Sequence, residues 1–171
     1  MSGPNILLTG NPGVGKTTLV RKIVEVMDTD VGGFYTEEIR SGGRRRGFKI
    51  RTFTGKEGIL AHLTCRSPFR VGKYGVDVES FERVAVPALQ EAIAQSQLIV
   101  VDEIGRMELY SKKFRQAVLQ ALDSPKPVLG VIQNRRENFL DQIRRRKDVV
   151  VLTVTHENRD SLVAKVKQTL E

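Results

Sequence analysis

The sequence predicts an α/β fold in which helices flank a mostly parallel sheet, and three observations point to it. Short apolar runs typical of buried strands alternate with segments whose apolar residues recur at helical spacing. Three extended runs between residues 33 and 63 are joined by turns too short for a helix, so they predict an antiparallel meander extending one edge of the sheet. A length of 171 residues suits one core, so a single domain over residues 1–171 is expected.

The first half of the chain contains one strand, one helix and this meander. The run Asn5-Ile6-Leu7-Leu8-Thr9 is apolar and ends before a glycine, as expected for a buried parallel strand. A helix is predicted from Lys16 to about Met27 because its apolar residues form one stripe. The strands of the meander are predicted at residues 33–39, 48–53 and 58–63, with Arg44, Arg45 and Arg46 in the first turn.

The second half alternates helices and strands. Helical spacing predicts a helix from about residue 79 to 95, with a kink at Pro87, and Ser111 is a predicted N-cap for the following helix. The remaining elements complete a β/α series. They are strands at residues 98–101, 127–133 and 149–154, and helices at residues 111–123, 137–146 and from 156 onward.

Residues 10–17 match the phosphate-loop pattern GxxxxGK[ST] without deviation, between a predicted strand and a predicted helix. Glycines let successive backbone N–H groups face one side, and the start of the helix adds a partial positive charge. A glycine-rich turn that only caps a helix is the weaker alternative. A polyphosphate is the expected ligand, and the residues predicted to bind it are Gly10, Asn11, Pro12, Gly13, Val14, Gly15, Lys16, Thr17 and Thr18.

Four side chains carry the predicted chemistry of this site. Lys16 is expected to neutralise the β- and γ-phosphates, and the Thr17 hydroxyl is expected to bind Mg²⁺. Asp102 ends an apolar strand whose carboxyl end should lie beside the phosphate loop, so it is the predicted partner of Mg²⁺. Glu103 is predicted to orient the attacking water and accept its proton, the alternative being a salt-bridged surface acid.

Several separated segments together resemble the small P-loop nucleoside-triphosphatases of archaea, thermophilic bacteria and animals, a family with a human member called cancer-related nucleoside-triphosphatase. The resemblance implies a RecA-like or AAA-like α/β core that slowly hydrolyses ATP, GTP and other nucleoside triphosphates with Mg²⁺. It does not supply a cellular role. The segments that carry it are the phosphate loop and residues 33–40, 42–48, 71–77, 102–109 and 157–159.

Phosphoryl transfer gains from a cation against the charge that develops on the γ-phosphate, so one arginine near the site is expected. Arg44, Arg45, Arg106 and Arg159 lie in the family-like segments. Arg106 is favoured because it is close in the chain to Glu103, together with the turn that holds Arg44 and Arg45. A solvated turn is the competing interpretation. The same turn is expected to be mobile and to contribute to binding or rate, since Gly42 and Gly43 permit movement.

No other side chain gives a sharp signal. Tyr35 and Tyr74 could stack on a base, although strand packing explains them equally well, and His62 and His156 have no partner at a recognisable spacing. The single cysteine, Cys65, predicts neither a disulfide nor a zinc site. Residues 134–137 do not match the guanine-reading element of GTPases, so discrimination between bases should be poor.

Composition indicates a cytosolic protein with no membrane segment and an anionic partner. The 28 Lys and Arg residues against 20 Asp and Glu residues give a net charge of +8, which favours nucleotide phosphates or nucleic acid. Two alternatives to hydrolysis stay open, namely a nucleotide or small-molecule kinase and an ATP-dependent nucleic-acid-binding module. Aromatic residues are only 6% of the chain and do not alternate with basic ones, so no specific nucleic-acid site is predicted. The sequence does not define the oligomeric state.

Overall fold

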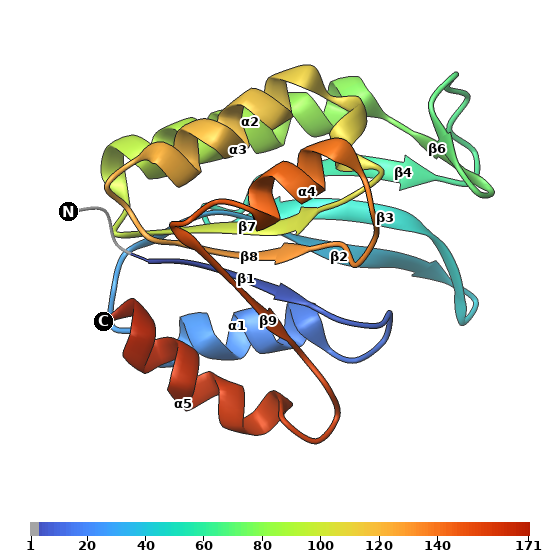
Figure 1. The fold of residues 1–171 in the computed structure, drawn as a ribbon. Helices are drawn as coiled ribbons and strands as arrows, with labels where there is room; N and C mark the ends of the chain where they lie inside the picture. Colours follow the sequence, from blue (N-terminus) through green and yellow to red (C-terminus); the bar gives the residue numbers. More distant parts are fainter. Residues whose placement is uncertain (1–3) are drawn as a thin grey trace.

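The computed structural model describes residues 4–171, in which nine strands form one sheet in the order β5-β6-β4-β3-β2-β7-β8-β1-β9 (Figure 1). Five of these strands form a parallel core, in which β2 pairs with β7, β7 with β8, β8 with β1 and β1 with β9. Because the core strands are parallel, their carboxyl ends lie along one edge of the sheet. The core strands are β1 (Asn5–Thr9), β2 (Val31–Ser41), β7 (Leu98–Ile104), β8 (Val128–Ile132) and β9 (Val149–Thr153).

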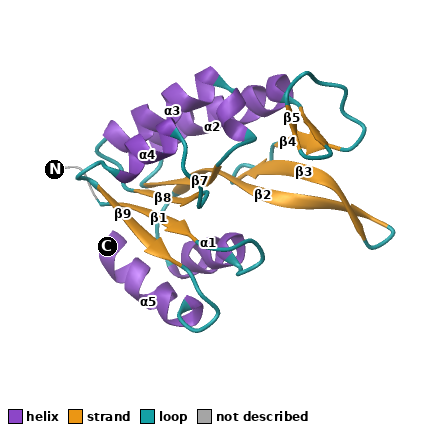
Figure 2. Ribbon diagram, turned by 45° about the vertical axis from the view of Figure 1, so that its right-hand side comes forward, coloured by secondary structure: helices purple, strands orange, loops and turns teal. Residues whose placement is uncertain are grey.

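Four antiparallel strands extend this core beyond β2, as the meander predicted. They are β3 (Arg44–Thr52), β4 (Glu57–His62), β5 (Arg70–Val71) and β6 (Tyr74–Val76). The β2–β3 hairpin is long, and Figure 2 shows its tip projecting away from the helices. β2 pairs with β7 only over residues 31–34 but continues to Ser41, so its second half forms a wall beyond the carboxyl edge of the core.

Helices cover both faces of the core sheet (Figure 1). α1 (Lys16–Val26) and α5 (Arg159–Leu170) lie on one face, and α2 (Val78–Gln95), α3 (Lys112–Asp123) and α4 (Asn138–Arg144) lie on the other. A short 3₁₀ helix, η1 (Glu108–Tyr110), connects β7 to α3. Within the part of the chain that the structure describes, no helix combines the length and apolar character needed to cross a bilayer.

The alternating elements follow the sequence expectations, with three corrections. Arg44, Arg45 and Arg46 do not form a turn but begin β3, because Gly42 and Gly43 alone close the hairpin with positive φ angles of 58° and 74°. The last helix begins at Arg159 rather than at residue 156. The short strands β5 and β6 were not predicted. The predicted cap is confirmed, since Ser111 Oγ accepts a 3.0 Å hydrogen bond from the backbone N–H of Phe114.

Three phenylalanines join the sheet to the two long helices. Phe34 of β2, Phe81 of α2 and Phe114 of α3 are almost fully buried, and their ring centres lie 4.9–5.9 Å apart in edge-to-face arrangements. Phe34 is in the last pair that β2 makes with β7, so this cluster fixes the strand just before it leaves the core. The wall formed by the hairpin is therefore anchored at its base.

Truncation of Phe34 tests this anchor. We expect Phe34→Ala to lower the free energy of unfolding by about 3–5 kcal/mol, because it removes a buried aromatic ring and leaves a cavity. Urea unfolding followed by circular dichroism measures the change. The matched control is Phe69→Ala, whose ring is 41% exposed and which should cost under about 1 kcal/mol. Equal losses from the two variants would contradict the assignment of Phe34 as an anchor.

Candidate functional site

The phosphate loop lies between β1 and α1, at the carboxyl edge of the sheet. Gly10 has a φ of 149°, and a Cβ atom added there would come within 2.7 Å of the carbonyl oxygen of Val154. Gly15 precedes α1 in the left-handed region, with a φ of 98°. No side chain caps α1 and its first turn holds no acidic residue, so the N–H groups at its start are available to an anion.

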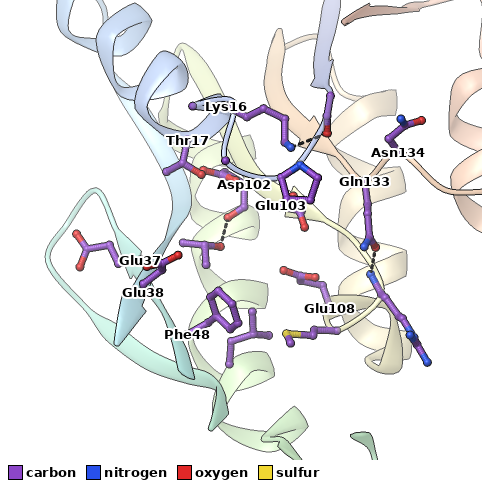
Figure 3. A pocket seen from close by; sticks show the side chains of 18 of the residues that line it. Lys16, Thr17, Glu37, Glu38, Phe48, Asp102, Glu103, Glu108, Gln133 and Asn134 are labelled. Carbon is purple, nitrogen blue, oxygen red and sulfur yellow. Dashed lines mark hydrogen bonds between the residues drawn. The ribbon is translucent and has the colours of Figure 1, made fainter. Parts of the chain in front are cut away.

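Lys16 lies across this loop (Figure 3). Its ammonium group donates hydrogen bonds of 2.7 Å to the carbonyl oxygen of Gly10 and 3.0 Å to that of Asn11. Both acceptors are neutral carbonyl groups of the loop itself. The positive charge of Lys16 is thus held over the loop without a carboxylate partner among the described residues, as a phosphate-binding lysine requires.

Asp102 is buried in β7, two residues before its end, beside Thr17 (Figure 3). Only 1% of its surface is exposed, and its backbone carbonyl oxygen accepts a 2.6 Å hydrogen bond from the Thr36 hydroxyl. Burial raises the pKa of the Asp102 carboxyl to about 7, an effect that the Thr17 hydroxyl opposes and the charge of Glu103 increases. Its Oδ2 atom is buried without a hydrogen-bond partner among the described residues. A cation beside Thr17 would satisfy this oxygen and restore the ionised form.

The donor set around Asp102 fits a metal that takes few protein ligands. Residues 4–171 contain no group of three His, Cys, Asp or Glu side chains arranged for a metal ion. Mg²⁺ usually binds through one or two protein oxygens and fills its remaining positions with water and substrate phosphates. Thr17 and Asp102 provide two such oxygens next to the phosphate loop, so the site suits Mg²⁺ bound together with a nucleotide.

Glu103 occupies an irregularity in the pairing of β7 with β8. Asp102 pairs with Val131 and Ile104 with Ile132, so Glu103 has no partner opposite it. Such a bulge changes the direction in which a side chain points, and Glu103 lines the same pocket as Lys16. Burial raises the pKa of the Glu103 carboxyl, and the charge of Lys16 opposes the rise. A carboxylate with a raised pKa is a stronger base than an exposed glutamate.

Gln133 follows β8 and was not predicted as a site residue. Its Oε1 atom accepts a 2.7 Å hydrogen bond from the backbone N–H of Arg106 (Figure 3). A Cβ atom added at Gly105 would come within 2.9 Å of Glu103 Oε1 and 3.1 Å of Gln133 Oε1, so both side chains lie against Gly105. Because the oxygen of the Gln133 amide is occupied, its NH₂ group is left to donate into the pocket.

Glu108 is a second residue that sequence reasoning missed. It begins η1, only 3% of its surface is exposed, and it points into the pocket (Figure 3). No hydrogen bond or ion pair joins its carboxyl to another described residue. Burial raises the pKa of this carboxyl well above its usual value, with a further rise from the charge of Glu103. Its spacing in the sequence gave no signal, because the residue enters the site only through the turn after β7.

These residues surround one pocket of about 610 Å³. The phosphate loop forms one side, the ends of β7 and β8 form the floor, and the β2–β3 hairpin forms the opposite wall. Beyond the residues already described, the lining includes Thr18, Glu37, Glu38, Phe48, Leu60, Val71, Met107 and Asn134.

The candidate arginines fall in different places. Arg106 lines the pocket and is exposed. Arg159 begins α5 and donates a 3.4 Å hydrogen bond to the carbonyl oxygen of Val14 in the phosphate loop. Arg44 is exposed at the start of β3, where it pairs with Ser41, and it does not line the pocket. Its neighbour Arg45 donates a 3.0 Å hydrogen bond to the Tyr74 hydroxyl.

The other candidate side chains make local contacts. Tyr35 packs against Phe53 and lies under the Arg21 guanidinium, outside the main pocket. Tyr74 is buried beside Phe48. His62 shares a 2.8 Å hydrogen bond with the Thr64 hydroxyl, and His156 is exposed. None of these residues lines the nucleotide side of the pocket.

Comparisons with known proteins cover nearly the whole chain. A family model described as NTPase matches residues 5–167. The chain is 46% identical over 166 residues to nucleoside-triphosphatase THEP1 of Thermotoga maritima, covering 97% of this chain and 95% of that protein. It is 45% identical over 175 residues to the human cancer-related nucleoside-triphosphatase, covering 93% and 92%.

Two solved structures are similar over their full length. The crystal structure of THEP1 from Aquifex aeolicus has a TM-score of 0.90 at 42% identity, covering 98% of this chain and 99% of that one. The solution structure of the human cancer-related nucleoside triphosphatase has a TM-score of 0.85 at 43% identity, covering 99% and 98%. The α/β architecture is therefore shared with both.

The buried Asp102 carboxyl predicts a pH-dependent stability in the metal-free protein. Its pKa is about 7 in the folded state and near 3.8 when unfolded. The unfolded chain therefore loses this proton near pH 4 and the folded protein keeps it up to about pH 7, so stability is highest below pH 4 and falls as the pH rises to 7. We expect Asp102→Asn to raise the free energy of unfolding at pH 8 by up to roughly 4 kcal/mol, with a smaller gain at pH 5. Urea unfolding in EDTA at both values measures this.

The exposed Asp28→Asn variant is the control and should change stability little at either pH. A gain from Asp102→Asn that is the same at pH 5 and pH 8 would show that the carboxyl does not titrate in this range.

Proposed function

The chain belongs to the NTPase family and is a hydrolase, and on that premise we propose that it cleaves nucleoside triphosphates to diphosphate and phosphate with Mg²⁺. ATP, GTP and other nucleoside triphosphates are the proposed substrates. The observation that carries the proposal is the position of two consecutive carboxylates, Asp102 and Glu103, facing the phosphate loop across one pocket.

The phosphate loop binds the part that all nucleoside triphosphates share. The free N–H groups at the start of α1 and the charge of Lys16 neutralise the β- and γ-phosphates. Lys16 now rests on the carbonyl oxygens of Gly10 and Asn11, and it exchanges these for phosphate oxygens on binding. Binding therefore depends on the loop rather than on the base.

Thr17 and Asp102 are the proposed protein ligands of Mg²⁺. When bound, the metal ion neutralises charge on the phosphate oxygens. Asp102 is suited to this task because its Oδ2 atom has no other partner and the Thr17 hydroxyl lies beside it. The Thr36 hydroxyl, on the neighbouring strand β2, donates the 2.6 Å hydrogen bond to the Asp102 carbonyl oxygen. This bond holds the backbone of Asp102, the proposed metal ligand, in place.

Glu103 is the proposed general base. Its carboxylate orients a water molecule and accepts its proton as the water oxygen bonds to the γ-phosphorus. The bond from this phosphorus to the β,γ-bridging oxygen breaks, and the diphosphate leaves. Gln133 is placed to donate from its NH₂ group to the same water or to a γ-phosphate oxygen, because its Oε1 atom is held by the Arg106 N–H.

Arg106 is the proposed source of positive charge for the transition state, since it lines the pocket next to Glu103. Arg44 would have to approach from the tip of the hairpin, and Arg159, which donates a hydrogen bond to the Val14 carbonyl oxygen, does not line the pocket. Residues 134–137 do not match the guanine-reading element of GTPases. Broad base specificity is therefore part of the proposal.

The proposal is tested by phosphate release from ATP, GTP, CTP and UTP with Mg²⁺ and with EDTA. We expect all four to be hydrolysed with differences below about a thousandfold, which corresponds to roughly 4 kcal/mol, and little release in EDTA. A preference for one base beyond that limit would contradict broad specificity. Undiminished release in EDTA would contradict the metal site at Thr17 and Asp102.

Replacement of Glu103 separates catalysis from binding. We expect Glu103→Gln to lower kcat by about 10²–10⁴, the usual contribution of a positioned general base, while Mg²⁺–nucleotide affinity stays nearly unchanged. Nucleotide Kd and single-turnover hydrolysis are measured on one preparation. Glu91→Gln, on the exposed side of α2, is the matched control. Wild-type hydrolysis would remove Glu103 from the mechanism, and equal losses in affinity and rate would make it part of the metal site.

A further inference from the structure

The antiparallel extension of the sheet carries most of the positive charge of the protein. Residues 37–77 contain ten Lys and Arg residues against four Asp and Glu residues, so this segment holds +6 of the net charge of +8. Its four acids are already engaged: Glu38 pairs with Arg40 and Arg45, Glu37 and Glu57 pair with Lys49 and Arg51, and Asp77 caps α2. Six of the ten cations are left without an ion pair among the described residues.

Five of these six cations gather at one end of the extension, and the sixth, Lys56, follows the opposite end of β3. All five side chains are exposed, so their charges are available to a partner. We call them the basic patch: Arg44 and Arg46 at the start of β3, Arg66 in the loop after β4, Arg70 in β5 and Lys73 in the turn between β5 and β6.

Backbone pairing makes the basic patch continuous across four strands. The N–H of Leu63, directly after β4, donates a 3.0 Å hydrogen bond to the carbonyl oxygen of Arg46. β4 pairs with β6 at Gly75, and Gly75 pairs in turn with Arg70 of β5. Three steps between neighbouring strands, each of about 4.8 Å, separate β3 from β5, so the patch spans roughly 14 Å. Figure 2 shows this region on the side of the molecule away from both termini.

One aromatic ring is held in an exposed position within the patch. Phe69 lies between Arg66 and Arg70 in the chain, and 41% of its surface is exposed. Its ring centre lies 5.0 Å from that of Tyr110, whose hydroxyl donates a 2.9 Å hydrogen bond to the Arg70 carbonyl oxygen. The Phe69 carbonyl oxygen accepts a 2.8 Å hydrogen bond from the backbone N–H of Val76. The ring is therefore fixed from below while its outer part faces solvent.

We propose that the basic patch and Phe69 bind single-stranded nucleic acid. The cations contact successive phosphates, and an unpaired base stacks on the exposed ring. A duplex keeps the faces of its bases stacked inside, so it can use the cations but not Phe69. These contacts do not read base edges, so binding should tolerate any sequence.

This surface is separate from the nucleotide pocket. Among the described residues that line the pocket, none belongs to the basic patch, and Phe69 is also outside it. The proposal therefore does not rest on the proposed hydrolysis. Sequence patterning predicted no specific nucleic-acid site, because the stacking position is created by the pairing of β5 with β6, which the sequence did not predict.

The test titrates fluorescein-labelled dodecathymidylate with the full chain and follows fluorescence anisotropy at several KCl concentrations. EDTA is present and nucleotide is absent, so the result does not depend on hydrolysis. We expect the logarithm of the binding constant to fall with the logarithm of the salt concentration with a slope of about −3.5, because each of five phosphate contacts on a single strand contributes about −0.7. A slope near zero, or equal affinity for a duplex of the same length, would overturn the proposal.

Two pairs of substitutions remove the same charge from different places. Arg46→Ala with Lys73→Ala should weaken binding and lower the magnitude of the salt slope by about 1.4. Arg145→Ala with Lys147→Ala, at exposed positions before β9, should leave the slope unchanged. Equal changes from the two pairs would show attraction by net charge alone and would overturn the basic patch as the site.

Replacement of Phe69 separates stacking from charge. We expect Phe69→Ala to raise the Kd about tenfold without changing the salt slope, because stacking releases no counterions. Val150→Ala, at a 48% exposed apolar position on β9, is the control and should change the Kd less than twofold. An equally small change from Phe69→Ala would remove the stacking contact. Phosphate release by every variant should stay within about twofold of wild type, which checks that the fold is intact.

Competition identifies the class of partner. Unlabelled dodecathymidylate should displace the labelled strand at a charge concentration about tenfold lower than polyglutamate or phosphatidylserine vesicles do, since neither offers a base to stack on Phe69. Equal competition by polyglutamate would assign the patch to an acidic protein segment, and equal competition by vesicles would assign it to a membrane surface. Either result would overturn the proposal.

Discussion

The parallel pairing of β8 with both β1 and β7 is the constraint on which the site depends. Val131 of β8 pairs with Leu8 on one side and Asp102 on the other, so the metal-binding carboxylate proposed here is level with the end of the strand that leads into Gly10. Side chains alternate between the faces of a sheet, so a slip of one residue would turn Asp102 away from its present position. The three strands are apolar and almost wholly buried on both faces, as the strands of a parallel core are.

Burial around this edge has a cost that the rest of the core must offset. Asp102, Glu103 and Glu108 are three acidic groups in one pocket, and desolvation raises the pKa of each. Lys16 opposes this only for the first two, and it is the cation of the phosphate loop. The two apolar clusters on the faces of the sheet provide the stability that lets such a site exist without its ligand.

The sequence predicted those parts of the site that depend on local pattern. Residues 10–17 and the apolar run that leads into Asp102 are continuous motifs, and the Ser111 cap follows from neighbouring residues, so their structure can be anticipated. Gln133 and Glu108 could not be found this way, because each enters the pocket through a contact or turn that tertiary structure creates. The charge and the flanking glycines of residues 44–46 predict a turn. Two glycines suffice for a tight hairpin, and the arginines therefore begin the strand.

The position of β9 at the edge of the sheet gives a consequence to the basic run that precedes it. Within residues 4–171, β9 pairs only with β1, and its sequence Val-Val-Val-Leu-Thr has the composition from which intermolecular β-sheets grow. Four consecutive cations, Arg144 to Lys147, followed by Asp148, stand immediately before it. Arg144 pairs with Asp141, and Arg146 pairs with Asp123 and Asp148, so Arg145 and Lys147 are the exposed cations that have no ion pair among the described residues. Exposed charges beside an open strand oppose the alignment of a second copy, as gatekeeper residues do in other sheet proteins. We therefore expect Arg145 and Lys147 to oppose edge-to-edge association at β9, whereas the opposite sheet edge, β5, is only two residues long and offers little for another chain to pair with.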